Sequence, residues 1–377
     1  MKVLLVTPWL SRAGASGVVT ACRTIAEALA RQDDVEVVVL GMSEDDASGD
    51  VGARVGFGAV RRQRRWALLS EGWPDYLAAR GWLRKSGFRP DVVHGQGLAG
   101  EGRVAVRLAN RLGIPSVVTV HGMPNKEARI SADPLRAFLA RRVMKQTLTN
   151  AAAVVFVSPY GSDDLELPQD AKRRIIPNAI ADDAFEAPGR QERSNTILYV
   201  GFLGRRKRLR DLLGACTVVR RTVADLRLRV AGPVREPDYA DEVRKDVAAL
   251  GLQDAVDFLG PLSPMELYAE YRSARLLALP SEEENAPQVI AEAMAAGLPV
   301  VATGVGGIPW MLAGGGGSIV GVGDLEAMAE RMADALRDDA RWEEMSRTAR
   351  AQAERFRADH VAAETLGLYR DLVGREG

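Results

Sequence analysis

Short apolar runs and longer amphipathic stretches alternate along most of the chain. Continuous apolar runs such as residues 3–6 and 276–279 are typical of strands buried on both faces of a parallel sheet. The stretches between such runs carry apolar residues three and four positions apart, which predicts helices. The alternation fades over 179–195, a run rich in Asp, Ala, Pro and Gly, and then starts again. We therefore predict two Rossmann-like α/β halves joined by a linker.

Each half contains a series of predicted strands. In the first half they lie at 3–6, 35–40, 91–97, 116–120 and 153–157. In the second half they lie at 196–200, 226–231, 255–258, 276–279, 298–302 and 318–320. Residues 41–58, rich in Gly, Ser and Asp, are predicted to form a loop, and a helical stretch is expected to open at residue 61. A final amphipathic helix is expected over 360–373.

Composition limits the classes of function. The 377 residues are 47% apolar and 27% charged, which suits two folded domains with a core each. Lys and Arg together number 50, as do Asp and Glu, so the chain lacks the basic excess that nucleic-acid binding favours. Cys22 and Cys216 lie far apart in predicted helices, which argues against a disulfide scaffold and suits a reducing cytosol. No apolar run approaches the ~20 residues of a membrane span, and the N-terminus indicates a first strand rather than a signal peptide.

The stretch 279–303 carries the most specific pattern in the chain. A predicted helix over 287–296 starts with Pro287, which suits a first helical position, and is apolar on nearly every side. Glu292 interrupts that apolar surface, and a carboxylate there needs a polar partner. Glu284 lies just before the helix, where backbone N–H groups and the helix dipole favour an anion. Taken alone, the two residues are equally well explained as a capping group and a solvated charge.

The surroundings of Glu284 and Glu292 favour a site. Pro-Ser precedes the first glutamate and Ala-Met-Ala-Ala-Gly-Leu-Pro-Val-Val follows the second. This pattern resembles the E-x7-E motif of the retaining family 4 glycosyltransferases. The resemblance implies that Glu284 contacts hydroxyls of the donor sugar and that Glu292 holds the ribose diol of the nucleotide. Asn285 and Ala286, next to Glu284, are predicted to belong to the same donor-binding loop.

The resembled family also implies an architecture. Its members have the GT-B fold, in which two Rossmann-like domains face each other across a cleft. Residues 1–178 would form the acceptor-binding domain, and the C-terminal helix, within 360–377, would cross back to it. Residues 179–359 would form the domain that binds the nucleotide-sugar donor.

Four consecutive cations, 205–208, follow the first predicted strand of the second half and precede a helix. Their charge and the helix N-terminus suit a diphosphate, although a solvated basic loop is the alternative. In the resembled family an Arg and a Lys of this loop hold the diphosphate. Lys207 matches the Lys, whereas Phe202 stands at the place of the Arg. Either Arg205 or Arg206 takes over, or the diphosphate is bound more weakly or in a different arrangement; we assign Lys207 and Arg206 to it.

His94 and His121 each lie at the end of a predicted strand of the first half, at the edge where open α/β sheets bind ligands. A lone histidine at a strand end is more often structural, but two at one edge favour a site. The resemblance assigns His121, in its Val-His-Gly setting, a place near the donor sugar. His94 matches the first histidine of a family His-x-His pattern on the acceptor side, but Gln96 stands in place of the second.

Glycines at two predicted turns suit close approach of a ligand to the backbone. Gly17 ends the loop after the first strand, and the resemblance implies contact with the donor diphosphate there. The loop lacks the G-x-G-x-x-G fingerprint, which argues against a dehydrogenase. Gly260 ends another predicted strand, and in the family the equivalent backbone contacts the nucleobase. Trp310 occupies the place of an acidic residue in the family's turn after the E-x7-E helix.

The sequence thus predicts a retaining glycosyltransferase that moves a sugar from a nucleotide-diphosphate sugar to an acceptor hydroxyl, with UDP or GDP as the nucleotide. His121, Lys207 and Glu284 are the predicted catalytic residues. No metal or other cofactor is expected, because cations would neutralise the leaving diphosphate and no cluster has metal-ligand spacing. Two alternatives remain: a sugar-nucleotide epimerase or phosphorylase of the same fold, and a binding protein without activity, suggested by Phe202 and Trp310.

The acceptor is left open as a glycan, a lipid-linked or a small molecule. We expect no nucleic-acid partner, a cytoplasmic location, and a monomer or homodimer. The basic residues at 61–65 beside Trp66 suggest peripheral contact with the inner face of an anionic membrane, although a solvated helix face is the alternative.

Overall fold

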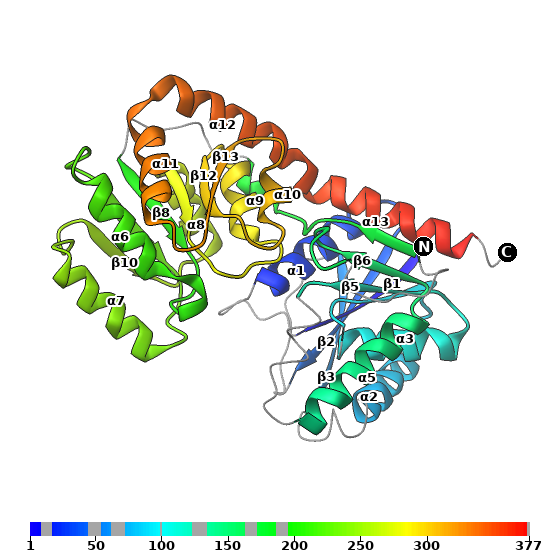
Figure 1. Ribbon diagram of the computed structural model, residues 1–377. Helices are drawn as coiled ribbons and strands as arrows, with labels where there is room; N and C mark the ends of the chain where they lie inside the picture. Colours follow the sequence, from blue (N-terminus) through cyan, green and yellow to red (C-terminus); the bar gives the residue numbers. More distant parts are fainter. Residues whose placement is uncertain are drawn as a thin grey trace. The chain divides into compact units, whose positions relative to one another are not determined.

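The computed structural model describes residues 1–8, 17–43, 54–61, 72–98, 100–122, 134–162, 172–185 and 195–374. The chain divides into two compact units, each built around a parallel sheet (Figure 1). One unit comprises Met1–Ala179 together with Ala358–Gly377, and the other comprises Ile180–Arg357. The boundaries expected from the sequence, after residues 178 and 359, differ from these by one and two residues.

The described strands of the first unit form one parallel sheet in the order β3-β2-β1-β4-β5-β6-β7. The strands are β1 Lys2–Pro8, β2 Glu36–Ser43, β3 Val55–Arg61, β4 Val92–Gly95, β5 Ser116–Val120, β6 Ala153–Phe156 and β7 Lys172–Ile175. The described helices are α1 Gly17–Ala30, α2 Trp73–Ser86, α3 Glu101–Leu112, α5 Pro134–Asn150 and α13 Ala358–Val373. Because successive strand residues point to opposite faces, Val3 and Leu5 pack with α1 and α13, whereas Leu4 and Val6 pack with α2 and α3.

The second unit has a parallel sheet in the order β10-β9-β8-β11-β12-β13. The strands are β8 Thr196–Val200, β9 Arg227–Ala231, β10 Val256–Gly260, β11 Leu276–Leu279, β12 Val300–Thr303 and β13 Gly317–Val320. The helices are α6 Leu209–Val219, α7 Pro237–Ala249, α8 Pro264–Ser273, α9 Gln288–Ala295, α10 Ile308–Leu312, α11 Leu325–Arg337 and α12 Asp339–Ala353. Short 3-10 turns are η1 Asp182–Ala184, η2 Arg205–Lys207 and η3 Glu354–Phe356.

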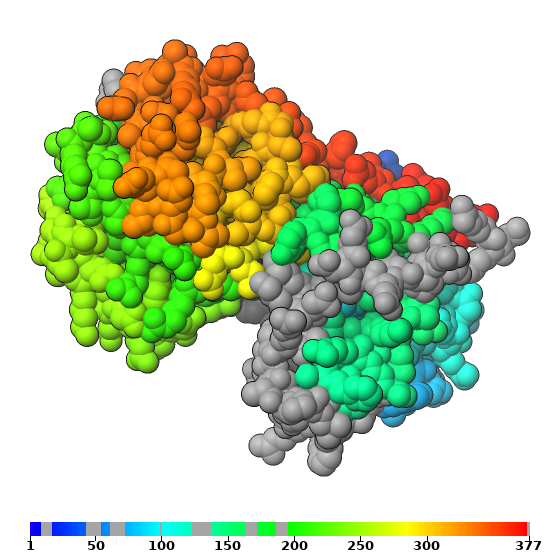
Figure 2. All heavy atoms as spheres, viewed as in Figure 1, coloured from blue at the N-terminus to red at the C-terminus, as the bar shows by residue number. Residues whose placement is uncertain are grey.

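Two helical layers cover this second sheet. Ile197 and Tyr199 of β8 pack with α6, α7 and α11, whereas Leu198 and Val200 pack with α8, α9, α10 and α12. In the space-filling view, the helices α6 and α7 (green) and α11 and α12 (orange) lie on the surface of the unit (Figure 2). The strands between the layers are therefore buried on both faces, which explains their continuous apolar runs.

The predicted loop over 41–58 is wrong at both of its ends. The strand β2 continues to Ser43, and Val55–Arg61 forms β3, which pairs with β2 in parallel. Its glycines, which suggested a loop, are required by packing: a Cβ on Gly58 would lie 2.2 Å from Cε2 of Trp82, on α2. Residues 62–71, where the predicted helical stretch and its basic cluster fall, lie outside the described residues.

Three further elements were absent from the prediction. These are the helix α3, whose buried Val104 and Leu108 do stand at helical spacing, the edge strand β7 and the short helix α10. In β7 the sequence is Lys-Arg-Arg-Ile, and the strand is half-buried to exposed, as an edge position allows. These elements complete the two sheets and their helical layers without changing the predicted fold class.

The C-terminal helix belongs to the first unit, as predicted. Leu366, Leu368 and Tyr369 of α13 lie in the same apolar cluster as α1. An ion pair between Arg31 and Asp359, with Nη2 to Oδ1 at 2.6 Å, joins the two helices at their surface. Among the described residues, no helix combines the length and the apolar character that crossing a bilayer requires.

Candidate functional site

Lys207 and Glu284 meet at the carboxyl edge of the second sheet. Lys207 lies in the loop after β8 and Glu284 in the loop after β11, and these two strands are neighbours. Lys207 Nζ donates to Glu284 Oε1, and the side chains are only 10% and 8% exposed. Ser281 Oγ donates to the same carboxylate oxygen at 2.7 Å. Two residues that are 77 positions apart thus form one buried charge pair.

A third loop fixes the backbone beside this pair. Gly306 has φ +57°, and a Cβ there would lie 1.6 Å from the carbonyl oxygen of Glu284, so the close approach requires glycine. The N–H of Gly307 donates to the carbonyl oxygen of Asn285 at 2.8 Å. Asn285 and Ala286 are both half-buried. The loop that carries Glu284 is therefore held from the side of the following strand, β12.

Glu292 lies on α9, buried in the apolar layer. Tyr271 of α8 supplies its polar partner, because the phenol donates to Glu292 Oε2 at 2.9 Å. Burial raises the pKa of the Glu292 carboxyl, and the hydrogen bond from Tyr271 opposes that shift. The expected first helical position of Pro287 is wrong: Pro287 is the N-cap, with extended backbone at φ −67° and ψ 117°, and the helix starts at Gln288.

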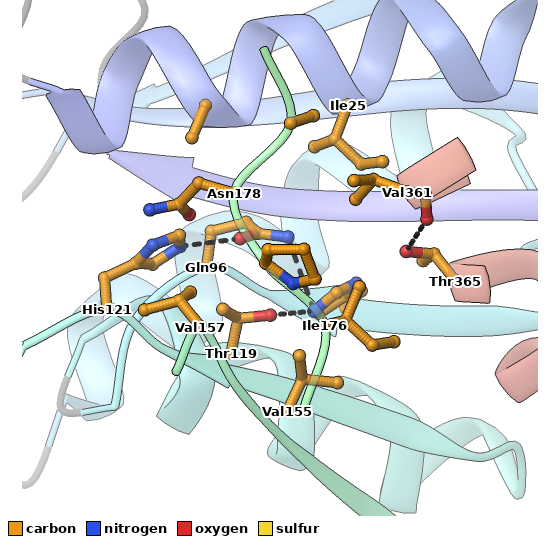
Figure 3. A pocket seen from close by; sticks show the side chains of 14 residues that line it. Ile25, Gln96, Thr119, His121, Val155, Val157, Ile176, Asn178, Val361 and Thr365 are labelled. Carbon is orange, nitrogen blue, oxygen red and sulfur yellow. Dashed lines mark hydrogen bonds between the residues drawn. The ribbon is translucent and has the colours of Figure 1, made fainter. Parts of the chain in front are cut away.

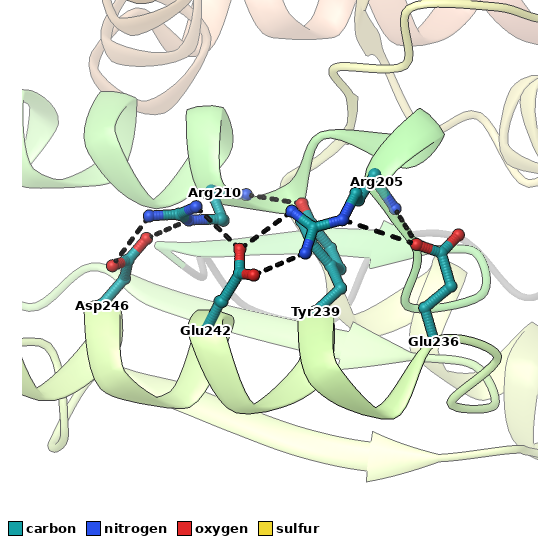
Figure 4. A network of polar contacts seen from close by, with 6 residues as sticks. All are labelled: Arg205, Arg210, Glu236, Tyr239, Glu242 and Asp246. Carbon is teal, nitrogen blue, oxygen red and sulfur yellow. Dashed lines mark hydrogen bonds and ion pairs between the residues drawn. The ribbon is translucent and has the colours of Figure 1, made fainter.

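The four consecutive cations point in different directions. Arg205 faces α7, where its guanidinium pairs with Glu242 (Nη2 to Oε1 at 2.5 Å) in a network with Arg210 (Figure 4). Arg208 pairs with Asp211, with Nε to Oδ2 at 2.7 Å. Arg206 instead stays beside the Glu284 loop, donating from Nη1 to the carbonyl oxygen of Glu283 at 2.8 Å. Of the two candidates for the missing arginine, Arg206 is therefore the better placed.

Gly260 and Gly17 both lie at element boundaries. Gly260 ends β10 with φ +68°, and its carbonyl oxygen accepts the Gly232 N–H at 2.8 Å. Gly17 is the first residue of α1 and is exposed, while the rest of its predicted loop lies outside the described residues. A Cβ on Gly260 would meet nothing within 4 Å, which leaves room for a ligand to approach the backbone there.

His94 and His121 lie in the same pocket of the first unit, joined by Gln96 (Figure 3). Gln96 Oε1 lies 2.8 Å from His121 Nε2, and Gln96 Nε2 lies 3.3 Å from His94 Nε2. Because an amide oxygen can only accept, the His121 Nε2 carries a proton in this arrangement. His94 Nε2 also lies 2.7 Å from Thr119 Oγ1, and His94 Nδ1 lies 2.5 Å from the hydroxyl of Tyr369 on α13.

Both imidazoles of the pocket are held neutral. Burial lowers the pKa of His94 to about 3, and the nearby His121 adds a smaller effect in the same direction. Burial lowers the pKa of His121 to about 4, against an opposing hydrogen bond from Asn178. At neutral pH both rings therefore act as hydrogen-bonding groups rather than as charges. Gln96 was predicted only as a departure from the His-x-His pattern, and Thr119, Asn178 and Tyr369 were not predicted to belong to the site.

Within the described residues, no group of three or more His, Cys, Asp or Glu side chains is arranged to hold a metal ion. Cys22 and Cys216 are free, buried thiols on α1 and α6. Burial raises the pKa of Cys216 to about 12, so this thiol is unreactive at neutral pH.

Two parallel α/β units of this kind define the GT-B fold, and solved structures share it. Sucrose-phosphate synthase from Thermosynechococcus elongatus superimposes with a TM-score of 0.81 at 21% identity, over 99% of both chains. Anabaena HepE in complex with UDP and glucose superimposes with a TM-score of 0.76 at 17% identity, over 99% of this chain and 100% of that one. The predicted fold is therefore confirmed.

Sequence comparison then gives the family. The models "Glycosyl transferase 4-like domain" and "Glycosyl transferases group 1" match residues 16–179 and 181–352. The D-inositol 3-phosphate glycosyltransferase of Corynebacterium urealyticum is 30% identical over 336 residues, which cover 81% of this chain and 78% of that protein. Its counterpart in Corynebacterium glutamicum is 30% identical over 339 residues, covering 82% and 80%. The chain belongs to the family 4 glycosyltransferases and is an enzyme of that class.

Proposed function

We propose that the protein is a retaining glycosyltransferase that moves a sugar from a nucleotide-diphosphate sugar to an acceptor hydroxyl without a metal ion. The observation that carries this proposal is the buried pair of Lys207 and Glu284 at the carboxyl edge of the second sheet. Open α/β sheets bind their ligands outside this edge. One cation and one carboxylate there suit a donor that carries both a diphosphate and sugar hydroxyls.

Lys207 and Arg206 are assigned to the diphosphate. As the sugar–phosphate bond breaks, negative charge grows on the leaving diphosphate, and a preorganised cation stabilises it. Glu284 accepts hydrogen bonds from the sugar hydroxyls, and Asn285 and Ala286 contribute their backbone to the same loop. A buried, prearranged ion pair suits this task because little reorganisation is needed when charge develops.

Glu292 and Gly260 are assigned to the nucleoside. Glu292 Oε2 accepts a hydrogen bond from the Tyr271 hydroxyl, whereas Oε1 accepts none from the described residues. A carboxylate with an oxygen left to accept can bind the two hydroxyls of a ribose diol. Gly260, with its left-handed backbone at the end of β10, would contact the base through main-chain groups.

The first unit is assigned to the acceptor and to the sugar. A neutral His121 suits hydrogen bonding to uncharged hydroxyls, and Gln96 orients its ring. We place His121 near the donor sugar, His94 behind it on the acceptor side, and the Gly17 turn near the diphosphate. Because His94 is buried and bonded through both nitrogens, it acts by positioning its neighbours.

The donor nucleotide is proposed to be UDP or GDP, and the solved structure of HepE with UDP and glucose supports a uridine nucleotide. The curated relatives are named D-inositol 3-phosphate glycosyltransferases, which favours a small-molecule acceptor over a glycan or a lipid-linked one. We propose a cytoplasmic enzyme, as two free thiols suggest, that acts as a monomer or homodimer with peripheral contact to the inner membrane face.

Calorimetric titration of the metal-free protein with UDP, GDP, ADP and dTDP tests the donor class. Selective binding of one diphosphate supports the proposal and sets the nucleotide for a screen of sugar donors and acceptors. Binding of none, by a folded protein, would overturn it. Turnover of the donor to another sugar nucleotide without an acceptor would instead indicate an epimerase, and binding without transfer or hydrolysis would indicate a binding protein.

A further inference from the structure

Phe202 stands where the resembled family places an arginine, yet its ring is surrounded by cations. Arg235 Cζ lies 4.5 Å from the ring centroid, Lys207 Nζ lies 5.4 Å from it, and Arg206 Cζ lies 5.5 Å from it. The negative face of the ring attracts each cation and so offsets part of their mutual repulsion. Three positively charged side chains therefore surround the uncharged ring of Phe202.

Arg235 is held at this place by its backbone. The loops after β8 and β9 are joined by a parallel bridge between Leu203 and Val234, and the Arg235 N–H donates to the Leu203 carbonyl oxygen at 3.1 Å. The approach is close enough that a Cβ on Gly232 would lie 2.1 Å from the carbonyl oxygen of Gly201. Arg235 therefore lies at the carboxyl edge of the sheet, beside the loop that carries Lys207.

The ion pairs around this loop leave two cations without a carboxylate. Lys207 pairs with Glu284, Arg205 with Glu242 and Arg208 with Asp211. In the part of the chain that the structure describes, neither Arg206 nor Arg235 is in an ion pair. Arg206 donates to a carbonyl oxygen, whereas the Arg235 side chain is exposed and, among the described residues, contacts the Phe202 ring. Excess positive charge at such an edge suits an anion with two negative groups.

We propose that Arg235 is a ligand of the donor's diphosphate and replaces the arginine that is absent from position 202. This inference rests on the proposed nucleotide-sugar donor. A guanidinium that packs on an aromatic face keeps its N–H edge available, so Phe202 supports Arg235 while its N–H groups bind phosphate oxygens. Lys207 supplies a second charge and Arg206 a third, so the diphosphate is held from the loops after both β8 and β9.

The test compares Arg235→Ala with Arg205→Ala, which removes the same charge from the same surface. Arg205 is the matched control because Glu242 holds its guanidinium against α7 (Figure 4). By calorimetry with UDP and GDP, we expect R235A to bind the diphosphate that the wild type prefers at least about 10-fold more weakly, as for loss of a charged hydrogen bond. R205A should change that affinity less than about threefold, as an exposed pair would. Affinity for uridine or guanosine should change in neither variant.

Adding Phe202→Arg to R235A provides a second measurement. Recovery of diphosphate affinity in the double variant supports the inference that the two positions serve one anion. R235A binding as tightly as the wild type, or weakened no more than R205A, would overturn it while leaving the proposed donor class intact. A wild type that binds neither UDP nor GDP would overturn both, so the two failures can be told apart.

Discussion

The buried pair of Lys207 and Glu284 allows stability and catalysis to be separated in one series of variants. Lys207→Met keeps the length of the side chain and removes its charge, which leaves the Glu284 carboxylate buried with the Ser281 hydroxyl as a remaining partner. Removing one partner of a buried pair costs about 3–5 kcal/mol of folding free energy. Because Ser281 still donates at 2.7 Å, we expect a loss at the lower end, about 3 kcal/mol.

The second variant also removes the negative charge of Glu284, which Lys207→Met leaves without its cationic partner. Lys207→Met combined with Glu284→Gln leaves two neutral side chains of nearly native shape, and we expect it to recover most of the lost stability, about 2 kcal/mol or more. Transfer should nevertheless fall by ~10²-fold or more in both variants, because the cation that offsets the leaving diphosphate is gone. Low activity in the single variant, which keeps Glu284, together with restored stability in the double variant would show that the Lys207 charge serves catalysis and not folding alone.

Urea unfolding followed by circular dichroism measures the first effect, and release of nucleoside diphosphate from the sugar donor measures the second. Arg210→Met is the matched control, since Arg210 pairs with Glu242 and Asp246 at the surface with a side chain 43% exposed. That variant should cost less than about 1 kcal/mol. The reasoning is refuted if Lys207→Met is as stable as Arg210→Met, or if it transfers sugar at close to the wild-type rate.

Three further predictions concern the nucleoside, the metal and pH. Glu292→Ala should weaken nucleoside diphosphate binding about 10-fold through the ribose and leave pyrophosphate binding unchanged, and equal calorimetric affinities would contradict that role. Chelation of divalent metals by EDTA should leave the transfer rate within about twofold, whereas a loss restored by Mg²⁺ would contradict cation-only catalysis. The free energy of unfolding should fall as the pH is lowered from 6.5 to 5. Over this range His94 becomes protonated in the unfolded chain but stays neutral in the folded protein, where its pKa is about 3. The expected loss is about 2 kcal/mol, and a His94→Gln variant with an unchanged pH slope in urea unfolding would contradict it.

Most strands of the two sheets could be predicted because they are buried on both faces. Such strands have continuous apolar sequences rather than alternating apolar and polar residues. The helix α13 was predicted from its amphipathic spacing, and α9 from the apolar stretch that follows Pro287. The strand β3 was missed because Gly56 and Gly58 resemble loop residues in sequence, although both are required by neighbours, Val38 and Trp82, that only the packed fold brings near.

The candidate site was predicted through motifs rather than contacts. Glu284, Glu292 and Lys207 were assigned their places by resemblance, and the structure adds that Lys207 touches Glu284. That contact follows from the strand order, which places β8 beside β11, and strand order is a long-range property that local patterns do not encode. For the same reason Tyr271 could not be foreseen as the partner of Glu292, since it comes from the preceding helix.

The residues that depart from the family's pattern bear on whether the site is intact. A protein that had lost its donor site would be under no constraint to keep unneutralised cations near the former diphosphate position, because repulsion among them only costs stability. Instead Phe202 is packed by Arg206, Lys207 and Arg235, so the charge removed from one position is present at its neighbours. Gln96 likewise bonds His121 where a histidine is missing. Departures that are each matched by nearby groups favour a rearranged donor site over a decayed one.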